Sequence, residues 1–138
     1  AADEPVLVTV RRANFWLLFF GFFAGSSGGL VLINHIHKIV AAHFGDPAHG
    51  GSEDAAKLTS DALVSILSIT NCLGRVGGGV GSDMAQAVMP RPRCFSLALA
   101  LMVLAHGLLL VGSASLPVVY LACACGGLSF GAYWSLVP

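Results

Sequence analysis

The sequence predicts an all-α, polytopic membrane protein with four transmembrane helices. Its 138 residues are 56% hydrophobic and only 10% charged, whereas an ordinary soluble domain has about 25% charged residues. Four apolar runs approach the length of about 20 residues that crosses roughly 30 Å of hydrocarbon. These observations exclude a typical water-soluble globule and make the lipid bilayer the expected partner. Seven basic residues balance seven acidic ones, so the chain lacks the basic face that would indicate a nucleic-acid partner.

The first predicted span follows a short polar segment. Residues 1–14 are expected to form a cytoplasmic juxtamembrane segment, and a four-helix transmembrane region is expected over 15–137. The first span covers about 15–37 and contains no Lys, Arg, Asp or Glu. Residues 45–60 are rich in Gly, Pro, Ser, Asp and Glu, which is the composition of a loop.

The second predicted span covers about 61–82. It begins at Asp61, is interrupted by one charge at Arg75 and is rich in glycine. A basic cytoplasmic loop is expected over 83–94, because the alternating prolines of Met89–Arg93 remove backbone donors and disfavour a helix.

The last two predicted spans are separated by a short link. The third covers about 95–112, and its polar side chain is His106. The fourth covers about 116–137, and Pro117 is tolerated there because a first helical turn needs no backbone donor.

The basic residues orient these spans. Cytoplasmic loops carry an excess of Lys and Arg. If every span crosses, five basic residues lie on the side of the chain ends, namely Arg11, Arg12, Arg75, Arg91 and Arg93. Lys38 and Lys57 lie on the other side, near the acidic residues of the loop 45–60. Both termini are therefore predicted to be cytoplasmic and the acidic loop non-cytoplasmic.

A glycine-rich segment in the second span, Leu73–Asp83, is the most informative stretch. Gly74 with Gly78, or Gly77 with Gly81, would lie on one helix face, where small residues let a neighbouring helix approach closely. Packing does not explain Arg75, because an Arg at the centre of a span costs about 2.5–3.5 kcal/mol on insertion scales. Arg75 precedes Asp83 by eight residues, about 12 Å along a helix, so a partner on another helix is expected.

These residues resemble a known family. The sequence Gly79-Val80-Gly81-Ser82-Asp83 before a basic turn is similar to a loop signature of the major facilitator superfamily. Three further segments are similar, more narrowly, to the nodulin-like branch of this superfamily: Asn14–Phe20, Gly74-Arg75 and Gly126–Gly131. The resemblance implies a partial major facilitator fold, in which this chain corresponds to the seventh to tenth of twelve helices.

The resemblance also implies roles for particular residues. Gly79 would permit close helix packing, and Asp83 would pair or cap at a helix end and hold the inward gate. Gly74 and Arg75 belong to the same motif region. The sequence departs from the signature at Met84–Ala87, where the family's basic residues are missing, and basic residues arrive later, at Arg91 and Arg93.

Polar side chains within the spans are candidates for lining a transport pathway, because such pathways run between helices with polar or broken segments. The candidates are Ser26, Ser27, Asn34, His106 and Tyr133. The alternative for the serines is helix packing. The alternatives for His106 are a proton site for symport and a hydrogen-bonded interhelical contact.

No metal, cofactor or catalytic site is predicted. His35, His37, His43 and His49 lack the spacing of a ligand set, the four cysteines are interpreted as packing residues, and no enzyme motif occurs.

The predicted function is that of part of a secondary-active transporter, which moves a small solute by alternating access together with missing helices or as a homo-oligomer. The alternative is a truncated or independent four-helix membrane protein that packs against a partner without transport of its own. A weaker alternative is a small channel-like oligomer.

Overall fold

The protein is a bundle of long helices. The computed structural model describes residues 6–45 and 52–137, and within these residues it contains helices and turns but no strand. The helices are α1 (Val6–Val10), α2 (Ala13–Phe44), α3 (Glu53–Ala85), α4 (Arg91–Gly112) and α5 (Leu116–Leu136). Helices α2 to α5 are long and apolar enough to cross a membrane. For the described residues, the predictions of an all-α architecture and of four helices long and apolar enough to span a membrane are confirmed.

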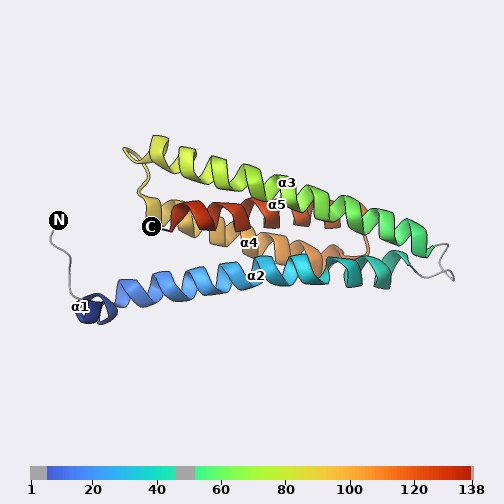
Figure 1. Ribbon diagram of the computed structural model, residues 1–138, viewed down its shortest axis with the longest axis horizontal. Coiled ribbons are helices and arrows are strands. Elements are labelled where there is room, and N and C mark those ends of the chain that lie inside the picture. Colours follow the sequence, from blue (N-terminus) through green and yellow to red (C-terminus); the bar gives the residue numbers. More distant parts are fainter. Residues whose placement is uncertain (1–5, 46–51, 138) are drawn as a thin grey trace.

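The four long helices alternate in direction, so that α1 and the end of α5 lie at the same end of the bundle (Figure 1). Helix α5 lies between α3 and α4 and also contacts α2. It is the most buried of the four long helices, since half of the residues in its most apolar stretch are buried inside the protein. The other three helices therefore pack around α5.

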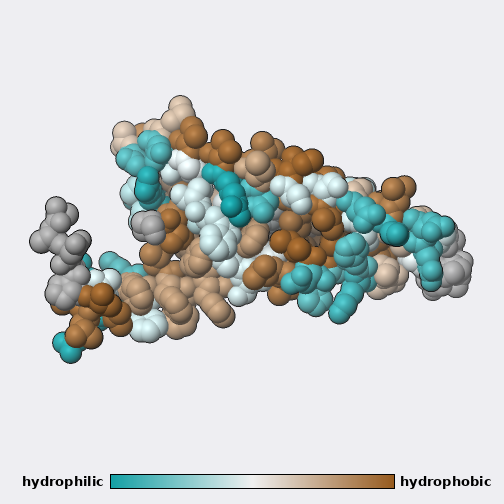
Figure 2. All heavy atoms as spheres, viewed as in Figure 1, coloured by the Kyte–Doolittle hydropathy of each residue, from teal (hydrophilic) through white to brown (hydrophobic). Residues whose placement is uncertain are grey.

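Two apolar clusters hold the bundle together. One joins α2, α3 and α5 around the fully buried Ile36, Leu63 and Val119. The other joins α4 and α5 around Met102 and Tyr133, with half-buried residues of α2 packed against it. In the face that Figure 2 shows, hydrophilic residues lie at both ends of the bundle and in a patch partway along it. Much of the remaining surface is apolar and faces outward. This distribution is the one expected when lipid covers the sides.

The helix pair α2 and α3 is longer than a membrane requires. With 32 and 33 residues, these helices are about 48–50 Å long, whereas the hydrocarbon core is about 30 Å thick. They project beyond the short turn between α4 and α5 (Figure 1). His35 and Lys38 of α2 and Glu53 and Asp54 in the first turn of α3 are all exposed.

The helices extend beyond the segments that composition predicts, so the loop between them is shorter than 45–60. Helix α2 continues past 37 to Phe44, and α3 begins at Glu53 rather than at 61. Ser52 caps α3 by accepting a 3.1 Å hydrogen bond from the Ala55 backbone N–H, and acidic residues in the first turn favour the positive end of the helix dipole. Residues 53–60 are helical despite their loop-like composition, because Ser52 caps the helix and because Ala56 and Ser60 are buried against the bundle. Residues 46–51 of that loop lie outside the described residues.

The predicted basic loop 83–94 is shorter than expected. Helix α3 ends at Ala85 and α4 begins at Arg91. Pro90 is the N-cap of α4 and Pro92 lies in its first turn, where the missing backbone donor has no helical partner to lose. The expectation that Arg91 and Arg93 lie outside a helix is therefore wrong, and Pro117 occupies the equivalent first-turn position of α5, as predicted.

The segment 1–14 contains a helix that the sequence did not lead us to expect. Its α1 is tied to α2 by a 2.9 Å hydrogen bond from the Trp16 indole N–H to the Val10 carbonyl.

Candidate functional site

The charged residue inside the second span, Arg75, contacts Trp134 of α5. The guanidinium carbon of Arg75, on α3, lies 5.9 Å from the centre of the Trp134 ring. On the other side, Phe22 of α2 meets the same ring edge-to-face, with centroids 5.4 Å apart. Three helices thus meet at one indole. A cation within about 6 Å of a Trp face is attracted by the ring's negative face, so Trp134 holds the guanidinium in place.

Two further polar side chains lie one helical turn from these contacts. Ser26 follows Phe22 by four residues on α2, and Asn71 precedes Arg75 by four residues on α3, so each shares a face with its neighbour. The Ser26 hydroxyl oxygen and the Asn71 Oδ1 are both buried and have no hydrogen-bond partner among the described residues. We call Phe22, Ser26, Asn71, Arg75 and Trp134 the Trp134 cluster.

No described residue supplies a counter-charge to Arg75, and the nearest acidic residue along α3, Asp83, is paired with Arg91. The Arg75 side chain is exposed and lies about 12 Å along α3 from Asp83. The partner of Arg75 on another helix is the Trp134 ring. This ring attracts the cation but does not neutralise its charge. Half of the Trp134 surface is also exposed, at 51%. The cation and the ring therefore face outward from the four-helix bundle.

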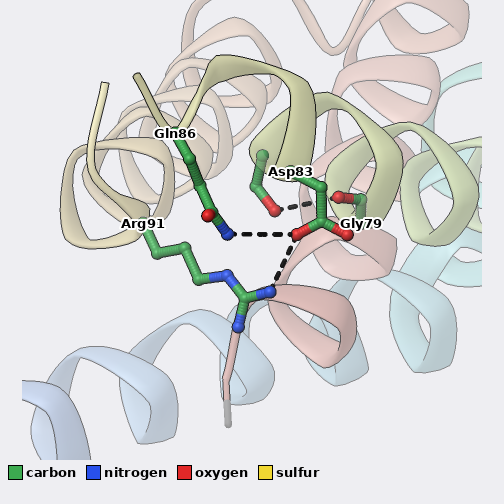
Figure 3. Close-up of polar contacts among 5 residues, drawn as sticks. Gly79, Asp83, Gln86 and Arg91 are labelled. Atoms are coloured by element: carbon green, nitrogen blue, oxygen red, sulfur yellow. Dashed lines mark hydrogen bonds and ion pairs between the residues drawn. The ribbon is translucent and has the colours of Figure 1, made fainter. Parts of the chain in front are cut away.

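The second charged feature is a clasp across the turn between α3 and α4 (Figure 3). Arg91 Nη2 donates a 2.8 Å hydrogen bond to Asp83 Oδ1 and forms an ion pair with it. Gln86 Nε2 donates to the same oxygen at 3.4 Å, and the Ser82 hydroxyl donates to the Gly79 carbonyl at 2.9 Å. Arg91 thus reaches back to Asp83 from the beginning of the next helix.

The predicted glycine faces have different environments. A side chain at Gly74 would collide with the Leu128 carbonyl of α5, and one at Gly78 would come within 3.0 Å of the Ala132 backbone. A Cβ added at Gly77 or at Gly81 would have no other atom of the bundle within 4 Å. The close helix contact is therefore made by Gly74 and Gly78.

Gly79 does not make that close contact. A Cβ at Gly79 would lie 3.7 Å from the Ser135 Cβ, which is an ordinary van der Waals distance. The packing role that the family resemblance implied for Gly79 therefore belongs to Gly74 and Gly78.

Tyr133 is a packing residue in this structure. It is fully buried, and its hydroxyl donates to the Ala98 carbonyl of α4 at 3.2 Å. The Ser129 hydroxyl donates to the same carbonyl at 2.6 Å. The tyrosine ring also fills the space that Gly25 leaves open on α2. Tyr133 therefore joins α4 to α5.

The other candidate pathway residues do not come together with Tyr133. Ser27 is half-buried, and Asn34 is exposed on the part of α2 nearer the α2–α3 connection. His106 is half-buried, with its Nδ1 3.0 Å from the Met102 carbonyl of its own helix. It lines a groove of about 310 Å³ between α2 and α4 together with His35 and His43.

These histidines do not form a metal site. Within residues 6–45 and 52–137, no three His, Cys, Asp or Glu side chains are placed to hold a metal ion, and His49 lies outside the described residues.

Two members of the Trp134 cluster, Asn71 and Phe22, were missed by sequence reasoning. A polar residue four positions before an intramembrane arginine is a detectable signal for Asn71, whereas nothing distinguishes Phe22 from the other aromatic residues of α2. Comparison with protein-family models, with curated proteins and with solved structures gives no match.

Proposed function

We propose that this chain is part of a secondary-active transporter that moves a small solute by alternating access, without chemical change of that solute. Alternating access requires contacts at helix ends that break and re-form in each cycle. The observation that carries the proposal is the clasp between Asp83 and Arg91.

The ion pair between Asp83 and Arg91 is weak enough to break and re-form in each transport cycle. The two side chains are 61% and 48% exposed, and an exposed ion pair contributes only about 0–1 kcal/mol. Thermal motion opens such a pair readily, yet its loss still shifts the balance between two conformations. Its place at the turn between two spans suits a gate that holds the helix ends together on one side of the membrane.

An uptake experiment tests the proposal for any small solute. Cells that naturally express the protein, in its native form, and matched cells from which it has been deleted are supplied with an isotope-labelled extract of small metabolites, and the solutes that accumulate are identified by mass spectrometry. We expect saturable accumulation of one solute class, reduced in Asp83→Asn and retained in Arg91→Lys, which keeps the charge. No difference between expressing and non-expressing cells would overturn the proposal.

A second candidate function is favoured by the open face of α3. Gly77 and Gly81 line an apolar groove of about 360 Å³ that α3 and α4 form together with residues of α5, including Ala132. A small-residue face of this kind admits another helix. In this alternative, the chain packs against a partner and does not transport.

The two candidates give different results in native membranes. The packing alternative predicts a complex that dissociates when Gly77 and Gly81 are both changed to leucine, without any solute accumulation by the unchanged protein. Accumulation that survives both substitutions would reject it.

A further inference from the structure

The Trp134 cluster contains a cation, Arg75, at a depth in the membrane where a charged side chain is energetically costly. If Asp83 and Arg91 mark the membrane surface, Arg75 lies about 12 Å deeper, near the middle of a hydrocarbon core about 30 Å thick. Ionisable residues at that depth face a cavity or pair with another group, and they mark solute and ion pathways. Arg75 contacts an aromatic ring and, among the described residues, no carboxylate.

The neighbours of Arg75 can bind more than a simple charge. Phe130 meets Trp134 edge-to-face at 6.4 Å, and Phe22 meets it from α2, so the indole that contacts the guanidinium is itself packed against two aromatic rings. The buried hydroxyl oxygen of Ser26 and the buried Oδ1 of Asn71 lack partners among the residues that the structure describes. Buried polar atoms are nearly always satisfied, so these two atoms indicate a hydrogen-bond partner that the described residues do not supply.

We propose that the Trp134 cluster binds the carboxylate of a small organic anion through Arg75. A guanidinium matches a carboxylate because its planar N–H groups donate two parallel hydrogen bonds. The aromatic rings contact the apolar part of the anion. One arginine balances one negative charge, so the preferred ligand is a monocarboxylate. This inference rests on the proposed function, because it names the class of solute that the transporter would carry.

The carboxylate has two conceivable sources, a soluble anion or an acidic side chain of another membrane helix. We propose the soluble anion, because in the proposed transporter the exposed Arg75 and the half-exposed Trp134 would face the pathway between these helices and the remaining ones rather than lipid.

The fluorescence of Trp134 tests the site directly. Trp16→Phe leaves Trp134 as the remaining tryptophan of the two. The full chain in neutral detergent is then titrated with iodide or with caesium, both of which quench fluorescence. A positive charge about 6 Å away enriches an anion about threefold even in water. We therefore expect iodide to quench about three times more strongly with Arg75 than in Arg75→Gln, while Arg75→Lys keeps part of the preference.

Competition then identifies the ligand class. Butyrate, a monocarboxylate with an apolar tail, should reduce iodide quenching at constant ionic strength, whereas its neutral analogue butyramide should not. The inference is wrong if neither ion quenches Trp134, if the iodide preference persists in Arg75→Gln, or if butyrate and butyramide act alike. It is also wrong if iodide is excluded and the protein forms oligomers that Arg75→Gln dissociates, because the anion is then a side chain of another copy.

This experiment separates the two proposals. Binding of butyrate without solute accumulation in cells would leave the anion site standing and reject transport. Accumulation of a neutral solute, with no anion effect on Trp134, would leave transport standing and reject the site.

Discussion

Individual glycines determine how closely α3 and α5 can approach. Gly74 lies against the Leu128 carbonyl, and Gly131 of α5 lies against the Asn71 carbonyl of α3. Backbone atoms cannot rotate away from an added methyl group as a flexible side chain can. The two helices are therefore held in contact from both sides by residues without a Cβ.

This contact makes a prediction with a matched control. We expect Gly74→Ala to lower the free energy of unfolding by about 1–3 kcal/mol, the usual cost of overpacking, because α3 and α5 must separate. Gly77→Ala should be neutral or stabilising by up to about 1 kcal/mol, since alanine is the better helix former and Gly77 has nothing within 4 Å. The measurement is helix loss in mixed micelles as the fraction of dodecyl sulfate rises. Equal stability of the two variants would contradict the close contact.

The polar residues at this scale divide into two kinds. Ser129 and Tyr133 donate to one carbonyl of α4 and are satisfied. The Ser26 hydroxyl and the Asn71 Oδ1 are buried and unsatisfied within the described part of the chain. Only the second kind has hydrogen-bonding capacity left for a ligand, and for that reason the candidate site is placed at the Trp134 cluster rather than at Tyr133.

The ends of the helices depend on a few local interactions. Helix α3 gains about two turns beyond the expected start because Ser52 caps it and acidic residues occupy its first turn. Helix α4 starts among prolines because its first turn has no need of their missing donors. Both features can be recognised in the sequence. The residues around them, however, have the composition of a loop, and that composition led to the prediction of a loop.

The cap of α3 can be tested by itself. We expect Ser52→Ala to raise the amide hydrogen-exchange rate in the first turn of α3 about fivefold, because loss of an N-cap costs about 1 kcal/mol. Ser65→Ala is the control, since the Ser65 hydroxyl donates within the helix to the Asp61 carbonyl and caps nothing. An unchanged rate in Ser52→Ala, or an equal rise in both variants, would show that the cap does not define the start of α3.

For the whole molecule, the arrangement of the helices makes a topology prediction. Both ends of the described chain lie at the same end of the bundle (Figure 1), together with Arg11, Arg12, Arg91 and Arg93 at the beginnings of α2 and α4. Because basic residues are retained in the cytoplasm, we predict that both termini are cytoplasmic. Epitope tags at the two termini should be cleaved by protease only when the cytoplasmic side is accessible.

The acidic connection between α2 and α3 provides the control for that experiment. An antibody against residues 45–60 should bind from the opposite side of the membrane. Tags that are accessible from different sides would mean an odd number of crossings, and four spans would then be wrong.

The class of protein and the number of spans follow from the amino-acid sequence, because hydropathy is a local property that is summed along each helix. The sequence also contains the glycines, Arg75 and Asp83, and it predicts that they matter. It cannot tell that Gly74 and Gly78, rather than Gly77 and Gly81, meet α5, since that choice depends on how α3 is rotated about its axis. Nor can it tell that Asp83 pairs with Arg91 while Arg75 meets Trp134. Contacts between helices depend on rotation, tilt and depth, and these are set by the packing of all four helices at once.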